Sequence, residues 1–182
     1  MQLHRYMYMN NNKTRNINKV CIQFVLFIFI ITGFSFKSYT QNPDWLWAKT
    51  AGGVFSYCTT AAMETDLQGN IYVAGAFDGP TLVFDTITIY NTSASGEDVF
   101  IVKFDPLGNV LWANGAGGQY TDFIHSLAVD SSGNVFIAGE YSYSDVFFDS
   151  LMLPYTPGTS MFLVKYDTDG NPLWAKSSSS ID

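Results

Sequence analysis

Short apolar runs separated by polar turns fill the chain after residue 40. Runs such as Val135–Ala138 and Met161–Val164 are rich in β-branched and aromatic residues, a composition that favours β-strands. Nowhere beyond residue 40 does the sequence sustain the 3.6-residue apolar period of an amphipathic helix. The pattern therefore predicts an all-β chain.

The C-terminal part of the chain shows the predicted unit most clearly. Four strands separated by turns are predicted there, with one further apolar run in the connection between the second and the third. The strands are expected at Ser126–Asp130, Asn134–Tyr141, Met161–Asp167 and Pro172–Lys176, and the further run at Val146–Leu153.

This unit is repeated along the chain. Asp98–Asn114 aligned with Ser160–Lys176 gives nine identical residues in 17 positions, and Asp66–Gly75 matches Asp130–Gly139 in the same way. Leu46–Lys49 copies the Leu-Trp-Ala-Lys segment at the end of the second unit. Self-similarity at a fixed spacing is the signature of a repeat architecture.

One type of turn recurs between the predicted strands. In Asp-x-x-Gly-Asn, the Asp carboxylate can accept hydrogen bonds from backbone amides two residues on, and the Gly can take the positive φ that reverses the chain. The same turn in the same place relative to the strands predicts hairpins. It occurs at Asp66–Asn70, Asp105–Asn109, Asp130–Asn134 and Asp167–Asn171.

A sheet of four short antiparallel strands has two apolar faces and buries both only by stacking on other sheets. We therefore predict blades of a β-propeller type, in about two units at 54–118 and 119–182, preceded by an orphan strand within 41–53. Trp47, Trp112 and Trp174 are the predicted wedges between neighbouring blades.

Two units are fewer than the four or more blades of a closed ring, so the predicted propeller is incomplete. We expect the chain to be a fragment of a longer repeat protein. Two alternatives remain, namely assembly of several copies into a ring and an open two-blade wedge. Neighbouring blades or other copies of the chain are accordingly its expected partners.

The repeated pattern resembles a known family. Asp-x-x-Gly-Asn-(Val/Ile)-(Tyr/Phe)-x-Ala-Gly, followed by Phe-(Ile/Leu)-Val-Lys-(Phe/Tyr)-Asp-x-x-Gly-Asn-x-Leu-Trp-Ala, is similar to the SBBP β-propeller repeat over residues 45–182. The resemblance implies propeller blades of a secreted or surface protein of Bacteroidetes-type bacteria, often one that ends in a sorting domain for type IX secretion. The sequence departs from that pattern in having Ser179 and Ser180 in place of the expected glycine pair, and in lacking such a sorting domain.

Residues 1–40 differ from the rest in charge and pattern. They carry five basic residues and no acidic one, and they contain the apolar run Phe24–Ile31. A basic start, a short apolar core and a polar end predict a signal peptide, with cleavage after Thr40, and a secreted or cell-surface location. An uncleaved membrane anchor is the alternative.

Residues 41–182 are strongly acidic, with four lysines, no arginine and all 16 acidic residues of the chain, a net charge of −12. Such a body repels phosphate backbones and anionic lipids. Nucleic acid is therefore not expected as a partner, nor is a membrane once the signal peptide is removed.

The candidate chemistry is sparse, and no catalytic, cofactor-binding or metal-ligating residue is assigned. Asp167, Asp169 and Asn171 resemble the start of a calcium loop, but Ser178 stands where its bidentate Glu belongs, and a plain turn is the preferred interpretation. The lone His125 has no nucleophile motif beside it. Cys58 is interpreted as a small buried apolar residue.

Other polar residues carry equally open interpretations. The acid pairs Glu97–Asp98 and Asp145/Asp149 are candidate glycosidase carboxylates, with solvated loop acids as the simpler explanation. Asn91–Ser93 is a glycosylation sequon, relevant only in a eukaryotic host. Loop aromatics that could stack on sugars, or merely pack the rim of the propeller, are Phe77, Tyr141, Tyr143 and Tyr155.

The sequence thus favours a non-enzymatic, exported β-propeller repeat scaffold for extracellular binding, adhesion or surface display, with an extracellular polymer or a protein as ligand. The alternative is a fragment of a secreted propeller enzyme, of the glycan hydrolase or lyase class, whose active site needs further blades.

Overall fold

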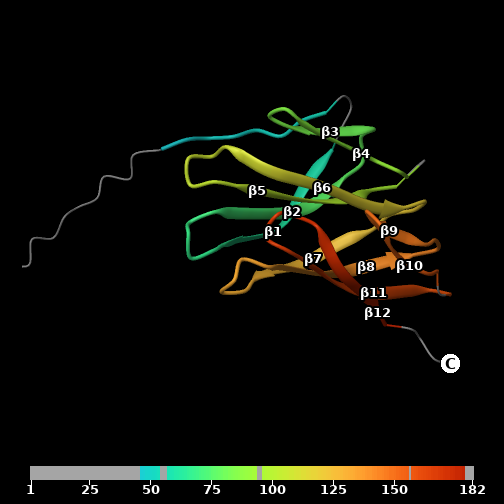
Figure 1. Ribbon diagram of the computed structural model, residues 1–182. Helices are drawn as coiled ribbons and strands as arrows, with labels where there is room; N and C mark the ends of the chain where they lie inside the picture. Colours follow the sequence, from blue (N-terminus) through green and yellow to red (C-terminus); the bar gives the residue numbers. More distant parts are fainter. Residues whose placement is uncertain (1–45, 54–56, 94–95, 156, 179–182) are drawn as a thin grey trace, which may run out of the picture. The chain divides into compact units, whose positions relative to one another are not determined.

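The computed structural model describes residues 46–53, 57–93, 96–155 and 157–178 (Figure 1). These residues form strands and turns and no helix, as predicted. The strands are β1 (Cys58–Thr65), β2 (Ile71–Phe77), β3 (Thr81–Phe84), β4 (Ile87–Tyr90), β5 (Asp98–Phe104), β6 (Val110–Gly118), β7 (Phe123–Val129), β8 (Val135–Ser142), β9 (Val146–Phe148), β10 (Leu151–Leu153), β11 (Thr159–Tyr166) and β12 (Pro172–Ser177).

The strands build two similar antiparallel sheets. Blade 1 consists of β1, β2, β5 and β6, which lie side by side in that order. Blade 2 consists of β7, β8, β11 and β12 in the corresponding order. Each blade carries an extra hairpin between its second and third strands, β3–β4 in blade 1 and β9–β10 in blade 2. The predicted four-stranded blade is thereby confirmed.

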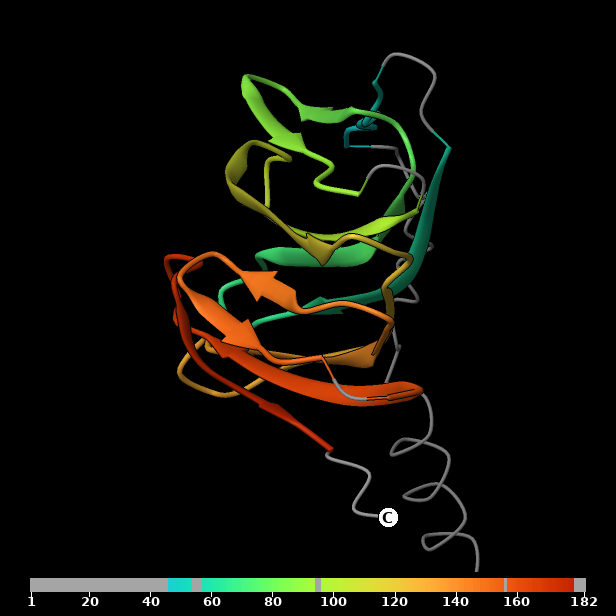
Figure 2. The ribbon, with the colours of Figure 1, turned by 90° about the vertical axis from the view of Figure 1, so that its right-hand side faces the viewer.

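The hairpin of blade 2 also ties the blades together. β9 pairs with the end of β6 through Gly117↔Phe147 and Gly118↔Val146, so β9 and β10 extend the sheet of blade 1 to six strands. Two blades joined in this way form an open stack and not a closed ring (Figure 2). The prediction of an incomplete propeller is confirmed for the described residues.

The main core lies between the two blades. Tyr72, Ala74, Val99 and Ile101 of blade 1 are buried against the facing side of blade 2. The residues that blade 2 contributes include Val135, Ile137, Phe162, Val164 and Tyr166. Burial of this apolar surface is the principal force that holds the blades together.

A second core lies on the opposite face of blade 1, beneath the β3–β4 hairpin. It is built of Phe77, Leu82, Phe84, Ile89, Phe100, Val102 and Phe104. β5 is therefore covered on both faces, and all seven of its residues are buried. β11, its counterpart in blade 2, instead alternates between exposed and buried residues.

The four predicted turns all form, with one shared pattern of hydrogen bonds. In the turn at 105–109, Asp105 Oδ1 accepts hydrogen bonds from the amides of Leu107 and Asn109, and its Oδ2 accepts one from Asn109 Nδ2. Gly108 has a φ of 83°, as the turn requires. The turns at Asp66, Asp130 and Asp167 repeat these bonds.

Two segments go beyond or differ from what the sequence predicted. The apolar run Val146–Leu153 is the hairpin of β9 and β10, because Asp149 at a φ of 52° reverses the chain. The leading segment, by contrast, is not the predicted strand. Among its described residues, 46–53, only Gly52 forms a bridge, to Val83, because no described strand lies along the remainder of the segment to pair with it.

The predicted signal peptide at 1–40 lies outside the described residues, as do the serines at 179 and 180. Within the part of the chain that is described, no helix has the length and apolar character needed to cross a membrane.

Candidate functional site

Trp112 lies half-buried at the junction of the two blades. Its ring stands edge-on to Tyr72, with 6.1 Å between the ring centroids, and its Nε1 donates a hydrogen bond of 3.0 Å to the carbonyl of Thr168 in blade 2. A side chain on Gly170 would collide with the indole ring. The predicted wedge between blades is therefore present at this position.

The other two tryptophans occupy equivalent places with different neighbours. Trp47 Nε1 donates to the carbonyl of Pro106 at 3.0 Å, and its ring packs on Phe104 of blade 1. Trp174 has an aromatic contact with Phe136 of its own blade, and no described residue accepts a hydrogen bond from its indole. Trp47 thus stands on blade 1 as Trp112 stands on blade 2, whereas no described blade lies beside Trp174.

A pocket of about 710 Å³ opens along the junction of the blades, where the β9–β10 hairpin meets the end of β6. Gly115–Gln119 form one wall, and packing requires glycine at positions 117 and 118. A Cβ on Gly117 would collide with the carboxylate of Asp98, and one on Gly118 would collide with the backbone of Asp145.

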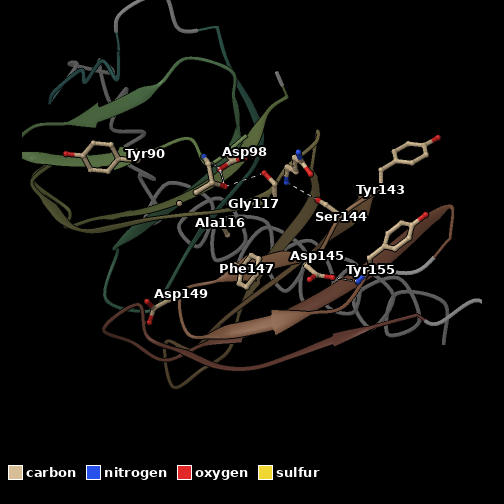
Figure 3. Close-up of a pocket in the computed structure, with 14 residues that line it drawn as sticks. Tyr90, Asp98, Ala116, Gly117, Tyr143, Ser144, Asp145, Phe147, Asp149 and Tyr155 are labelled. Carbon is tan, nitrogen blue, oxygen red and sulfur yellow. Dashed lines mark hydrogen bonds between the residues drawn. The ribbon is translucent and has the colours of Figure 1, made fainter. Parts of the chain in front are cut away.

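Three tyrosines stand around this pocket. Figure 3 shows the rings of Tyr143 and Tyr155 at one end and that of Tyr90 at the other, with Phe147 between them. Tyr143 also packs edge-on against Tyr120, with 5.9 Å between the ring centroids. All three pocket tyrosines are exposed, which makes them available to a ligand.

The sequence interpretation identified two of these three rings. Tyr143 and Tyr155 lie on loops, as expected, but Tyr141 and Phe77 are buried, and Tyr141 donates a hydrogen bond to the carbonyl of Pro154. Both are buried because they lie near the ends of β8 and β2, at positions that face a core. Tyr90 was missed, since the loops around the pocket do not repeat in sequence.

Asp98 and Asp122 form a pair of buried carboxyl groups behind the glycine wall. Each is only 1% exposed, and each has one oxygen, Oδ1, without a hydrogen-bond partner among the described residues. The second oxygen of Asp98 accepts hydrogen bonds from the amide and hydroxyl of Thr92, and that of Asp122 accepts one from the amide of Gly118. Sequence reasoning missed Asp122.

Burial governs the protonation of this pair. Loss of hydration raises the pKa of Asp98 above its usual value, although Thr92 stabilises the charged form. Burial, with the nearby charge of Asp98, also raises the pKa of Asp122 to about 7, against the effect of the Gly118 amide. The pair is thus poised to hold a proton near neutral pH.

The other candidate acids are divided between two hollows. Asp145 and Asp149 both line the pocket, and Asp145 Oδ1 accepts a hydrogen bond from the amide of Tyr155. Glu97, next to Asp98 in sequence, lines a different hollow beside Asp78. Of the two predicted acid pairs, only Asp145 and Asp149 therefore share a site, and Asp98 joins them at its wall.

Neither His125 nor Cys58 lies in the pocket. His125 is exposed and faces Glu140, with 3.6 Å between Nε2 and the carboxylate. Cys58 is exposed at the start of β1, so its interpretation as a buried apolar residue is wrong. β1 is the edge strand of blade 1, and seven of its eight residues are exposed.

The calcium-like segment forms a turn. Asp167 Oδ1 accepts hydrogen bonds from the amides of Asp169 and Asn171, and its Oδ2 accepts one from the Asn171 side chain. The Asn171 side chain holds the pKa of Asp167 below its usual value. No group of three potential metal-ligating side chains occurs among the described residues.

The amide group of the sequon at Asn91 is engaged in the fold. Asn91 Nδ2 donates to the carbonyls of Phe77 and Gly96, and its Oδ1 accepts from the amide of Ser93.

Comparison with known proteins agrees with this architecture. The profile of the SBBP β-propeller repeat matches residues 115–147, which run from the end of β6 through β9. An uncharacterized WD repeat-containing protein of Acanthamoeba polyphaga mimivirus is 31% identical over 165 aligned residues, covering 76% of this chain. The chain spans 12% of that relative's length. Residues 115–147 therefore match the SBBP β-propeller repeat, and the two described blades have a propeller-like repeat fold.

Proposed function

We propose that the chain is a non-enzymatic, exported propeller scaffold, used in adhesion or surface display, that binds an extracellular polymer in the pocket at the junction of its blades. The supporting observation is the set of exposed rings of Tyr90, Tyr143 and Tyr155 around a pocket of about 710 Å³. Exposed aromatic side chains that gather around a pocket commonly mark binding surfaces.

The chemistry of the pocket favours a neutral, hydroxyl-rich polymer such as a glycan. Aromatic faces can pack on the apolar faces of sugar rings, while Asp145 and Asp149 can accept hydrogen bonds from hydroxyl groups. No arginine occurs after residue 40, and no lysine lines the pocket. An anionic ligand would therefore meet unfavourable charge there.

Binding to an array of neutral and acidic glycans, followed by calorimetry on the best ligand, tests this proposal. Tyr143→Ala and Tyr155→Ala should each weaken binding by roughly tenfold, as expected for loss of one stacking contact worth about 1–1.5 kcal/mol. Tyr57→Ala is the matched control, because Tyr57 is exposed and does not line the pocket. Equal affinities for all three variants would contradict the proposal.

Export is tested separately. Residues 1–40 fused to a reporter enzyme that is active only outside the cytoplasm should give activity, and replacing Phe24–Ile31 by polar residues should abolish it. A reporter that stays inactive with the natural leader would remove the exported part of the proposal and leave the binding part standing.

The enzyme alternative has one observation in its favour, the buried Asp98–Asp122 pair, in which the pKa of Asp122 is about 7, since a carboxyl group that keeps its proton near neutral pH can serve as the general acid of glycoside hydrolysis. Both side chains are only 1% exposed, so a substrate would not reach them in this arrangement. Release of reducing ends from a bound glycan, lost in Asp98→Asn, would favour the hydrolase over the scaffold.

A further inference from the structure

The outward face of blade 2 is an apolar sheet surface without a neighbour among the described residues. Met161 and Leu163 of β11 are 66% and 41% exposed, and Phe123 of β7 is 40% exposed. Phe136 and Trp174 lie half-buried on the same sheet. A shallow hollow of about 460 Å³ between β8, β11 and β12 lies over this surface.

The equivalent face of blade 1 is covered. By the repeat, Met161 and Leu163 correspond to Val99 and Ile101, which are 1% and 2% exposed. What covers them is the inner side of blade 2, with which they share the main core. The chain therefore contains a template for what a blade of this type accepts on its outward face.

Polar contacts at the covered face show how the neighbouring blade is held. Lys103 Nζ and Trp112 Nε1 both donate to the carbonyl of Thr168, at 3.1 and 3.0 Å. Asn114 Nδ2 donates to the carbonyl of Gly170 at 2.6 Å. The acceptors are backbone carbonyls of an Asp-x-x-Gly-Asn turn, so these contacts depend on the backbone conformation of the turn and not on its side chains.

Blade 2 presents the same donors in the same places. Lys165 and Trp174 correspond to Lys103 and Trp112, and Lys176 replaces Asn114 as a donor. Two lysines on this face, in a body with only four, complement the acidic turns of another blade. The expected occupant is therefore a blade edge that carries Asp-x-x-Gly-Asn turns.

Blade 1 offers such an edge, incompletely covered. Ile71 and Val73 are half-buried, whereas their counterparts in blade 2, Val135 and Ile137, are 0% and 1% exposed. The carbonyl of Pro106, which corresponds to that of Thr168, accepts its hydrogen bond from Trp47. Segment 46–53 thus stands in for a preceding blade.

We propose that the outward face of blade 2 docks blade 1 of a second copy of this chain, with Trp174 of the first copy replacing Trp47 of the second on the carbonyl of Pro106. The contact is head-to-tail, so repetition leads to a ring or a filament. Segment 46–53 is the internal competitor. It is held by the Trp47 hydrogen bond, the Lys49–Asp85 ion pair and the Gly52–Val83 bridge.

Sedimentation velocity of the purified full chain over a range of concentrations tests this contact. The wild-type chain should associate weakly, because the competing segment belongs to the same molecule and has a high effective concentration. Trp47→Ala should raise the association constant by about tenfold or more, which corresponds to about 1.4 kcal/mol. Leu163→Glu should abolish association in both the wild-type and the Trp47→Ala background, because it places a charge in the docked surface.

Met152→Glu is the matched control, since Met152 is 51% exposed on β10 and lies outside the docking face. Circular dichroism and the thermal midpoint establish that each variant is folded. Leu163→Glu alters an exposed side chain, so its result is interpretable even if Trp47→Ala fails to fold.

Monomers at every concentration, for both the wild-type chain and a folded Trp47→Ala, would overturn docking of a second copy and leave the face to a different partner. Association that Leu163→Glu reduces no more than Met152→Glu does would overturn the assigned surface. Neither outcome affects the glycan proposal, which concerns the pocket lined by Tyr143 and Tyr155.

Discussion

Replacing Trp112 and Trp174 by alanine, one at a time, measures what a neighbouring blade adds to a repeated residue. The two indoles occupy equivalent positions in β6 and β12, and each packs on an aromatic ring of its own blade, Tyr72 or Phe136. Loss of that shared contact costs about 0.5–1.5 kcal/mol in either variant. Of the two, only Trp112 has a second blade against it in the part of the chain that is described.

The contacts with the second blade set the difference. Trp112→Ala removes the hydrogen bond to the carbonyl of Thr168, worth about 1 kcal/mol. It also removes the packing of the indole on Gly170, for which we take the value of one buried methylene group, about 1 kcal/mol. We therefore expect the free energy of unfolding to fall by about 3 kcal/mol for Trp112→Ala and by about 1 kcal/mol for Trp174→Ala.

Urea unfolding gives both values when it is followed by far-ultraviolet circular dichroism, which reports the backbone and does not rely on tryptophan fluorescence. The comparison holds if the dependence of the free energy of unfolding on urea concentration is the same in all variants. Trp112→Phe is the control, because it keeps a ring on Tyr72 but loses the hydrogen bond and part of the packing on Gly170, and it should cost about 1–2 kcal/mol. Equal losses for Trp112→Ala and Trp174→Ala would refute the reasoning, since the blade interface would then contribute nothing at this residue.

Three further predictions follow from single positions. The free energy of unfolding should fall as the pH rises from about 4 through 7, because the pKa of Asp122 is about 7 in the folded chain against an ordinary 3.8, and the stabilisation from the bound proton is lost over that range. Asp122→Asn should flatten this profile in a pH series of thermal melts, and an unchanged slope would contradict the assignment. Gly139→Ala should prevent folding or lower the thermal midpoint severely, because the added Cβ would collide with the backbone of Phe123, whereas Gly115→Ala should be tolerated, because its Cβ would have its nearest neighbour at 3.5 Å. Similar soluble yields and thermal midpoints for the two variants would count against this packing. Asp105→Ala should lower the midpoint of urea unfolding, because the exposed turn loses the three hydrogen bonds that the carboxylate accepts. An unchanged midpoint would show that the turn is held by its glycine alone.

The repeat itself made most of the fold predictable. Strand order and the four turns follow from the spacing of Asp, Gly and Asn, because each turn satisfies its own backbone amides through one carboxylate. The hairpin at Val146–Leu153 was harder to foresee. Its reversal depends on Asp149 in the left-handed region, which Asp tolerates without a glycine signal in the sequence.

The pocket was less predictable for a physical reason. Its wall of glycines lies in the repeated part of β6, but its tyrosines come from connections whose sequences differ between the units. Tyr90 is the last residue of β4 and Tyr155 follows β10, and neither has a counterpart at the equivalent position in the other unit. Comparison of the two units therefore predicts the blades but not the tyrosines that surround the pocket.

β5 and β11 show most directly what the sequence leaves open. They match closely in sequence, and both read as nearly continuous apolar runs, the pattern of a strand covered on both faces. β5 is buried at all seven residues, while β11 exposes every second residue along its first part. The apolar character of β11 thus exceeds what the described blades cover. A surface that keeps Leu163 and Met161 where its twin keeps buried Ile101 and Val99 has the composition of an interface, so the sequence of β11 is best explained by a neighbour that packs on this face, as in the proposed head-to-tail contact.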